Sequence, residues 1–268
     1  MGSGLLEQEP KLLRMKVKNL GKLQWLEFDL LAECSHIQHG VFLRHGGESQ
    51  GAFGTLNVSF TVGDDISTVQ NNRDLIVSTL SSDDIVTTHH AAKQCHSDRV
   101  VEIFPGADEI SPKCDALVTC HLHCALMIQH ADCQAGIIYD PIHHVVANVH
   151  AGWRGSVANI YAKTLDTMNA LYNTQPQDVL VCISPSLGPE AAEFLNYREE
   201  LPESFWSFQV KSYYFDFWAI TEMQLYACGV LPCHIECARL CTYSHPRDFF
   251  SYRREKVTGR HGTVVVLR

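Results

Sequence analysis

The expected fold class is α+β, and two kinds of sequence pattern agree with it. Short apolar runs bounded by turn residues are typical of buried strands and occur at Val100–Phe104, Ala116–Thr119, Ala125–Ile128, Ala135–Tyr139 and Val145–Val149. Residues 67–80 and 157–172 instead place their apolar side chains near one face at helical spacing. Because no Pro/Gly/Ser-rich linker or repeat divides the chain, we expect one domain over residues 21–268, after a loosely ordered segment over residues 1–20.

Flanking segments extend this pattern of strands and helices. Further strands are expected at Lys22–Leu31, His39–Arg44, Val179–Ser184 and Gly262–Leu267. Thr221 and Gln224 have the spacing of a capping box, which predicts the start of a short helix that ends at Gly229. Residues 190–218 are aromatic and irregular. Such side chains can stack on a purine, but they more often belong to a core.

Composition limits the classes of function. With 268 residues, 46% of them hydrophobic, the chain can bury a sizeable core. The 21 basic and 30 acidic residues give a formal charge of −9, which argues against a nucleic-acid partner but leaves room for a small basic pocket. No apolar run reaches the ~18 residues of a membrane span. Eleven cysteines without a signal peptide indicate reduced thiols, so we expect a cytoplasmic location.

The stretch from Ala131 to Gly155 combines strand patterns with chemically active side chains. Cys133 stands just before one predicted strand, and His150 follows the end of the next. A thiolate and an imidazole at the ends of neighbouring strands can converge, although 17 residues separate them along the chain. A metal ion or a catalytic Cys/His pair requires this geometry.

Three other segments carry weaker signals. His45–Gly51 contains three glycines, but its spacing matches neither a dinucleotide loop nor a P-loop, so a turn between strands is favoured. Cys120–Cys124 reads Cys-His-Leu-His-Cys, yet alternate side chains of a strand face opposite ways and cannot all bind one ion. Four cysteines between Cys228 and Cys241 lack the paired spacing of zinc fingers, and we expect buried reduced thiols there.

Five motifs, taken in order, resemble those of the YfiH-like family. They are RHGGESQGAFGTLN at Arg44–Asn57, QCHSDRV at Gln94–Val100, ADC at Ala131–Cys133, HAGWRG at His150–Gly155 and FFSYRREKVTGR at Phe249–Arg260. Members of this family, formerly called polyphenol oxidases or laccases, are described as purine nucleoside phosphorylases with adenosine deaminase activity. The resemblance implies an α+β fold of mixed β-sheets packed in layers with outer helices, similar to that of toxin deamidases.

The resemblance also selects site residues. It implies that His96, Cys133 and His150 are the catalytic residues and the metal ligands; without it, nothing would distinguish His96 from its histidine and cysteine neighbours. Two imidazoles and one thiolate suit zinc, with copper as the alternative, and leave a fourth position open for water or substrate. Arg44 and Asn57 match family positions, and Arg44 can offer a guanidinium fork to phosphate.

Backbone N–H groups at the predicted helix start, residues 155–156, offer a further anion site beside His150 and Arg154. We therefore expect Arg44, Asn57 and Arg154 to bind substrate.

The function that the resemblance implies is zinc-dependent phosphorolysis of purine nucleosides. Adenosine, inosine and methylthioadenosine would react with phosphate to give the free base and ribose-1-phosphate, and adenosine would also be deaminated. The partners are then a purine nucleoside and phosphate, with no nucleic acid and no membrane. The H-x-E and P-C-x-x-C signature of base deaminases is absent from the sequence.

Two other classes of enzyme remain open. In a hydrolase or deamidase, including one that edits cell walls, Cys133 would be the nucleophile and His150 its base. A copper-dependent phenol oxidase would follow from the older family name. Multicopper enzymes need many paired histidine ligands, and apart from His121 and His123 such pairs are missing, so this class ranks last.

Overall fold

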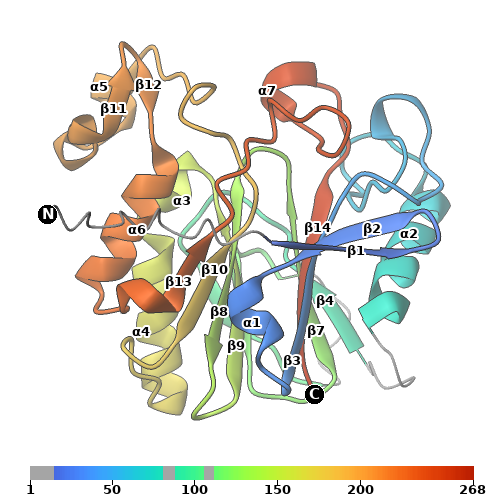
Figure 1. Cartoon of the computed structure of the whole chain (residues 1–268), viewed down its shortest axis with the longest axis horizontal. Helices are drawn as coiled ribbons and strands as arrows, with labels where there is room; N and C mark the ends of the chain where they lie inside the picture. Colours follow the sequence, from blue (N-terminus) through green and yellow to red (C-terminus); the bar gives the residue numbers. More distant parts are fainter. Residues whose placement is uncertain (1–14, 81–87, 106–111) are drawn as a thin grey trace, which may run out of the picture.

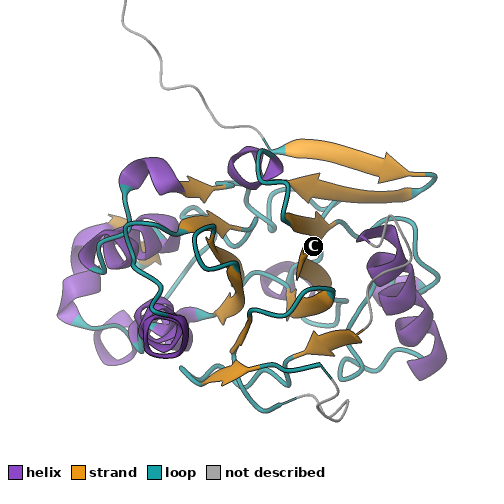
Figure 2. Cartoon of the chain, turned by 90° about the horizontal axis from the view of Figure 1, so that it is seen from below, coloured by secondary structure: helices purple, strands orange, loops and turns teal. Residues whose placement is uncertain are grey.

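The computed structural model describes residues 15–80, 88–105 and 112–268. It has two six-stranded sheets packed against each other, with helices on both outer sides (Figures 1 and 2). Each sheet contains parallel as well as antiparallel neighbours. The predicted α+β fold of mixed β-sheets packed in layers with outer helices is therefore confirmed.

The first sheet has the strand order β1-β2-β3-β14-β7-β4. Its strands are β1 (Lys16–Leu20), β2 (Leu23–Glu27), β3 (Ile37–Phe42), β14 (His261–Leu267), β7 (Cys124–His130) and β4 (Thr88–Ala91). Neighbours are antiparallel except β4 and β7, which run parallel. The last strand of the chain, β14, thus lies inside the sheet, and all seven of its residues are buried.

The second sheet has the order β13-β10-β8-β9-β6-β5. Its strands are β13 (Ile235–Cys237), β10 (Leu180–Ile183), β8 (Gln134–Asp140), β9 (Val145–Ala151), β6 (Ala116–Thr119) and β5 (Val100–Glu102). β8 and β9 form a fully buried antiparallel hairpin, in which Ala135 lies opposite His150 and Gln134 opposite Ala151. This register brings the start of β8 and the end of β9 to the same edge of the sheet.

Helices connect and cover the sheets. The α-helices are α1 (Asp29–Ala32), α2 (Ile66–Leu80), α3 (Trp153–Val157), α4 (Ile160–Tyr172), α5 (Tyr197–Glu200), α6 (Phe217–Ala227) and α7 (Tyr252–Glu255). Short 3₁₀ helices occur at Gly51–Phe53, Glu203–Phe208 and Pro232–His234, and β11 (Gln209–Lys211) pairs with β12 (Tyr214–Phe215). Within the described ranges, none of the helices has the length and apolar character needed to cross a bilayer.

Three apolar layers hold the elements together. Between the sheets, Leu126, Ile128 and Val265 of the first sheet share a buried core with Ala135, Ile137 and Tyr139 of the second. α2 packs on the outer face of the first sheet, and α4 on that of the second (Figure 1). Fully burying one large apolar side chain contributes roughly 1.5 to 3 kcal/mol, so these three layers stabilise the packing of sheets and helices.

The amino-terminal part of the chain differs from the prediction. Lys16–Leu20 is not loose but forms β1, which pairs antiparallel with β2; residues 1–14 lie outside the described ranges. All five residues of β1 are exposed, so the strand lacks the apolar alternation that would have marked it. The strand predicted over Lys22–Leu31 ends at Glu27, because α1 follows and its Asp29 and Leu30 N–H groups donate to the Glu236 carboxylate at 3.3 and 2.7 Å.

Two helix boundaries also differ. The helix predicted over residues 157–172 begins at Ile160, because Asn159 adopts a left-handed conformation (φ 53°) and its side chain caps α4 by accepting from the Ala162 N–H. Val157 is instead the last residue of α3. The capping box at Thr221 is wrong. α6 begins four residues earlier, at Phe217, with the Asp216 carboxylate accepting from the N–H groups of Trp218 and Ala219.

The aromatic segment over residues 190–218 forms a small core of its own. Phe205, Phe215 and Phe217 are buried in it, and Trp153 and Phe194 pack against it while partly exposed. The core is built mainly by residues that lie outside both sheets, and its exposed edge faces the start of α3.

Candidate functional site

The three predicted ligands meet at one edge of the second sheet. Cys133 immediately precedes β8, His150 is next to last in β9, and His96 belongs to the loop after β4. The hairpin register of β8 and β9 brings the first two together, and the loop adds the third. One ligand atom from each of the three side chains lies within 4.8 Å of the others. We call this set the His96–Cys133–His150 cluster.

The cluster fits a tetrahedral metal ion. The Cys133 Sγ and His96 Nε2 atoms are 3.9 Å apart, and the two imidazole rings meet edge to face at 4.9 Å between centroids. Zinc bond lengths place a sulfur and a nitrogen ligand about 3.6 Å apart, so the Cys133 and His96 ligand atoms need only a slight contraction. His150 is 3% exposed, whereas His96 is exposed, so the cluster is open to solvent on the side of His96.

A buried carboxylate orients two of the ligands. Asp115 is fully buried, and its Oδ1 atom accepts hydrogen bonds from the His150 Nδ1 and the His96 backbone N–H, each at 2.9 Å. The Ser97 N–H and hydroxyl both donate to Oδ2 at 2.7 Å. With Nδ1 engaged, Nε2 of His150 remains for the cluster, as in the carboxylate–histidine–metal arrangements of many metal sites.

Asp115 was missed as a functional residue by sequence analysis. The available signal was a carboxylate at the start of an otherwise apolar strand, Ala116–Thr119. Burial acts to raise the pKa of this carboxyl, but hydrogen bonds from His150 and Ser97 outweigh burial and hold the pKa below its usual value. Asp115 is thus an ionised anchor at neutral pH.

The cluster is electrostatically coupled. Burial favours the neutral forms of Cys133 and His150, yet their mutual attraction prevails, because a thiolate and an imidazolium stabilise each other. The pKa of Cys133 falls to about 6, and that of His150 rises to about 9, with the Asp115 hydrogen bond adding to the rise. The metal-free protein therefore holds Cys133 as a thiolate, the form that binds metals and attacks electrophiles.

Gly152 leaves room for the cluster. A Cβ atom at this position would lie 2.7 Å from His96 Cδ2 and 3.0 Å from Cys133 Sγ, so any side chain would displace ligands. Asp132, which precedes Cys133, has a left-handed backbone conformation (φ 83°). Its carboxylate accepts hydrogen bonds from the Thr242 hydroxyl and the Arg253 N–H, both at 2.6 Å. These two hydrogen bonds connect Asp132, and with it the neighbouring Cys133, to the carboxyl-terminal part of the chain.

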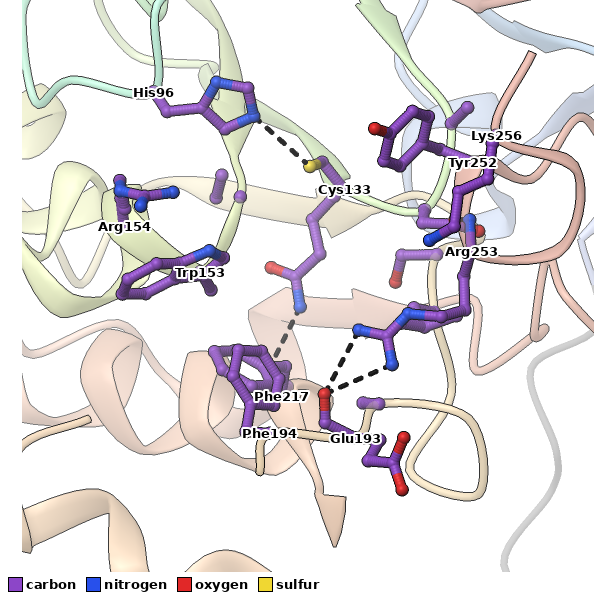
Figure 3. Close-up of a pocket in the computed structure, with 18 residues that line it drawn as sticks. His96, Cys133, Trp153, Arg154, Glu193, Phe194, Phe217, Tyr252, Arg253 and Lys256 are labelled. Carbon is purple, nitrogen blue, oxygen red and sulfur yellow. Dashed lines mark hydrogen bonds between the residues drawn. The ribbon is translucent and has the colours of Figure 1, made fainter. Parts of the chain in front are cut away.

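One side of the cluster forms the wall of a cavity of about 540 Å³, within the ordinary range for small-molecule sites (Figure 3). We call this the aromatic cavity, because Trp153, Phe194 and Phe217 line it together with His96 and Cys133. Charged and polar side chains complete its wall: Asp132, Gln134, Arg154, Glu193, Arg253 and Lys256. The volume and the aromatic wall suit a flat heterocycle with a polar substituent.

A second cavity, of about 490 Å³, lies on another side of the cluster and is lined by all three ligands. We call it the cationic cavity, because Lys93 and Arg260 line it. His96, Cys133 and Tyr252 line both cavities, so the cluster stands where the two meet.

Two predicted substrate residues lie elsewhere. The Arg44 guanidinium donates to the carbonyls of Gly54 (3.0 Å) and Pro246 (3.1 Å) and packs 4.6 Å above the Phe250 ring. Asn57 is fully buried, and its side chain accepts from the Arg260 N–H at 2.9 Å. Neither side chain is among the described residues that line the two cavities, so no contact there supports direct substrate binding by Arg44 or Asn57.

Arg154 does line the aromatic cavity, where its guanidinium stacks 4.0 Å from the Trp153 ring. The anion site predicted at residues 155–156 needs correction. α3 begins at Trp153 rather than at residue 157, and the Ser156 N–H already donates to the Gly152 carbonyl at 2.9 Å. The helix turn itself thus uses that donor.

Within residues 15–80, 88–105 and 112–268, the His96–Cys133–His150 cluster is the one group of three or more His, Cys, Asp or Glu side chains close enough to share an ion. The Cys120–Cys124 and Cys228–Cys241 runs form no such group there. All eleven cysteines are free thiols.

Known proteins share this sequence and fold. The family model described as "Multi-copper polyphenol oxidoreductase laccase" matches residues 38–268. A purine nucleoside phosphorylase of Bacteroides thetaiotaomicron is 33% identical over 244 residues, covering 85% of this chain and 90% of that protein. Purine nucleoside phosphorylase YfiH of Escherichia coli is 26% identical over 254 residues, covering 91% of this chain and 97% of its own.

Solved structures agree. The crystal structure of YlmD from Geobacillus stearothermophilus has a TM-score of 0.82 at 26% identity, covering 94% of this chain and 98% of that one. A Bacillus licheniformis YfiH structure, 23% identical, shares the fold with a TM-score of 0.83. The chain therefore belongs to the multi-copper polyphenol oxidoreductase laccase family, the YfiH-like family that its motifs resemble.

Proposed function

We propose that this protein is a zinc-dependent purine nucleoside phosphorylase that acts on adenosine, inosine and methylthioadenosine and also deaminates adenosine. One observation carries the proposal: His96 and Cys133 of the His96–Cys133–His150 cluster form part of the wall of the aromatic cavity, in a chain whose relatives are named purine nucleoside phosphorylases. Copper is the alternative metal, since the same imidazole and thiolate ligands bind it. The eleven free thiols favour a reducing compartment such as the cytoplasm.

The aromatic cavity supplies recognition of the base. Trp153 and Phe194 meet edge to face at 6.2 Å, and Phe194 lies 5.1 Å from Phe217, so three rings form one continuous wall. Stacking of a purine base on an aromatic side chain contributes ~1 to 3 kcal/mol per base to binding. The Gln134 side chain donates to the Phe217 carbonyl (3.0 Å) and accepts from the hydroxyls of Thr221 (2.8 Å) and Tyr161 (3.1 Å), so this residue of the cavity wall is fixed in place.

Phosphorolysis exchanges one bond at the ribose C1′ atom. A phosphate oxygen forms a bond to C1′ while the bond from C1′ to purine N9 breaks. The electron pair leaves with the purine, which takes up the proton that the hydrogen phosphate gives up. The protein must hold both reactants in line and exclude competing water. A metal ion held by the cluster would supply Lewis-acid polarisation at its fourth position. Asp115 keeps His150 and His96 oriented throughout.

Deamination uses the same cavity in a different pose. Water adds to C6 of adenosine, and the amino group takes up a proton and leaves as ammonia, which gives inosine. A base beside C6 is needed to accept the proton of the water. Because Cys133 would be a ligand of the metal ion, this base must be another group at the wall of the aromatic cavity.

A cysteine hydrolase or deamidase is the second candidate. The specific observation in its favour is the chain of contacts from Cys133 to His150 to Asp115, in which the thiolate, the imidazole and a buried carboxylate follow one another as in Cys/His nucleophile sites. This enzyme would need no metal, so chelation separates the two candidates.

Product analysis tests the proposal. Zinc-loaded protein is incubated with adenosine or inosine, each with and without phosphate, and the products are separated by chromatography. Phosphate-dependent release of adenine and hypoxanthine, lost on chelation and in Cys133→Ala, is the expected result; conversion of adenosine to inosine without phosphate would report the deaminase. Nucleosides that survive intact in every mixture would sink the purine assignment and leave the hydrolase.

A further inference from the structure

All three residues of the His96–Cys133–His150 cluster line the cationic cavity, which is separate from the cavity that would bind the purine. Lys93 and Arg260 bring two positive charges to its wall, and none of its lining residues in the described part of the chain is a carboxylate. The aromatic cavity differs, because Asp132 and Glu193 line it beside its cations. A multiply charged anion is therefore favoured on the cationic side.

Hydrogen-bond donors on this wall are available. Arg260 Nη1 donates to the carbonyls of Thr258 (2.8 Å) and Gly259 (3.0 Å), which fixes the guanidinium plane. Its other two guanidinium nitrogens make no hydrogen bond to any residue that the structure describes, and Lys93 forms no ion pair there. Ser59 and Thr61 add hydroxyl groups to the same wall. The two hydroxyls hydrogen-bond each other at 3.2 Å, which leaves one of their two protons for a ligand.

Hydrogen bonds from two amide side chains hold these donors in position. The Asn57 side chain accepts from the Arg260 N–H (2.9 Å) and the Ser59 N–H (3.0 Å), so one buried amide holds two residues of the wall. On the other side, the Gln94 side chain donates to the Gln129 carbonyl (2.6 Å) and accepts from its N–H (2.8 Å). That clamp fixes the loop between Lys93 and His96 on strand β7.

Tyr252 marks the boundary between the cavities. It lines both, and its ring lies 5.1 Å from the Lys256 ammonium of the aromatic cavity and 5.7 Å from the Arg260 guanidinium of the cationic cavity. Displacement at one carbon places the entering and the leaving groups on opposite sides of that carbon. Two cavities that meet at His96, Cys133 and Tyr252 offer this arrangement for a ribose held between them.

We propose that the cationic cavity binds the phosphate co-substrate through Arg260 and Lys93, while the aromatic cavity binds the purine. The assignment rests on the proposed phosphorylase function and deepens it. The phosphate oxygen that attacks C1′ approaches from the side of Arg260, and the purine leaves toward Trp153 and Phe194. Asn57 is then a positioning residue, which acts through Arg260 and Ser59 rather than by touching substrate.

Calorimetric titration of inorganic phosphate and, separately, of inosine into zinc-loaded protein tests the assignment. Lys93→Glu and Arg260→Lys are each expected to weaken phosphate binding by about tenfold or more, because they remove or misplace a charged donor, and to change inosine binding by less than about twofold. Lys163→Glu, the same charge change on the exposed face of α4, should leave both affinities unchanged.

Each alternative outcome has a definite meaning. If Lys256→Glu, in the aromatic cavity, weakens phosphate binding and Lys93→Glu does not, the assignment is overturned. It is also overturned if the unaltered protein binds no phosphate. If phosphate binds and depends on Lys93 and Arg260 but nucleosides are never cleaved, the anion site stands and the phosphorylase function fails.

Discussion

Two glycine-containing segments of this chain have similar compositions, but their glycines have different structural roles. Arg44–Gly54 and His150–Gly155 each combine an arginine, a histidine and at least two glycines. At Gly46 a Cβ atom would lie 2.5 Å from the backbone of Leu23, whereas at Gly152 it would lie against His96 and Cys133. The first segment thus makes room for the backbone, and the second for ligands. A glycine motif acquires functional meaning only from what occupies the space beside it.

Gly152→Ala should have the largest effect on activity. The added methyl group displaces two ligands at once, so we expect zinc content and phosphorolysis to fall by more than the roughly 10 to 100-fold typical of changes behind a metal ligand. The melting temperature should change little, because Gly152 has ordinary backbone angles (φ −77°). Elemental analysis of zinc, activity and thermal unfolding measure these three quantities.

Gly46→Ala provides the matched comparison. This residue has φ +87° and backbone contacts at 2.5 Å, so the substitution should cost roughly 3 kcal/mol of unfolding free energy. Protein that remains folded should retain its zinc. If Gly46→Ala lost zinc while staying folded, or Gly152→Ala kept it, the distinction between the segments would be wrong.

Asp115→Asn should reduce zinc affinity and activity by roughly 10 to 100-fold. The amide keeps the shape but removes the charge that holds His150 and the His96 loop. Asp140→Asn offers a control, because Asp140 is also buried and paired with a histidine, His143, at the far end of β8. Equal losses of zinc in the two variants, by competition against a zinc indicator, would show that Asp115 has no special role.

Cys133 should titrate at lower pH than an ordinary thiol in the metal-free protein. Its pKa is lowered to about 6, so the thiolate is lost as the pH falls through 6 and is fully formed near neutrality. The rate of alkylation should therefore rise about tenfold between pH 5 and 7 and then level off. A rate that keeps rising to pH 9, measured by mass spectrometry of the Cys133 peptide, would contradict the coupling to His150.

Arg44→Ala should have the smallest effect on activity and a clear effect on stability. The guanidinium holds two carbonyls and covers the Phe250 ring, so we expect a loss of about 1 to 3 kcal/mol with phosphate affinity changed by less than about twofold. A tenfold rise in the KM for phosphate, with unchanged stability, would instead restore the role that the sequence motif suggested for Arg44.

These contrasts show which features a sequence can reveal. The buried strands at Ala135–Tyr139 and Val145–Val149 have short apolar runs, and their hairpin places Cys133 beside His150, so the strands and the cluster could be predicted. β1 could not, because its side chains are all exposed. The role of Asp115 and the separation into two cavities could not be predicted either, since both arise from contacts between distant segments.

Transfer of labelled phosphate tests the central claim most directly. Zinc-loaded protein is incubated with inosine and ³²P-phosphate, and hypoxanthine and labelled sugar phosphate are counted together. We predict one labelled sugar phosphate for each hypoxanthine, with both products lost in Gly152→Ala. Hypoxanthine without label would mean that water, not phosphate, attacks the ribose, and intact inosine would show that the His96–Cys133–His150 cluster serves a different chemistry.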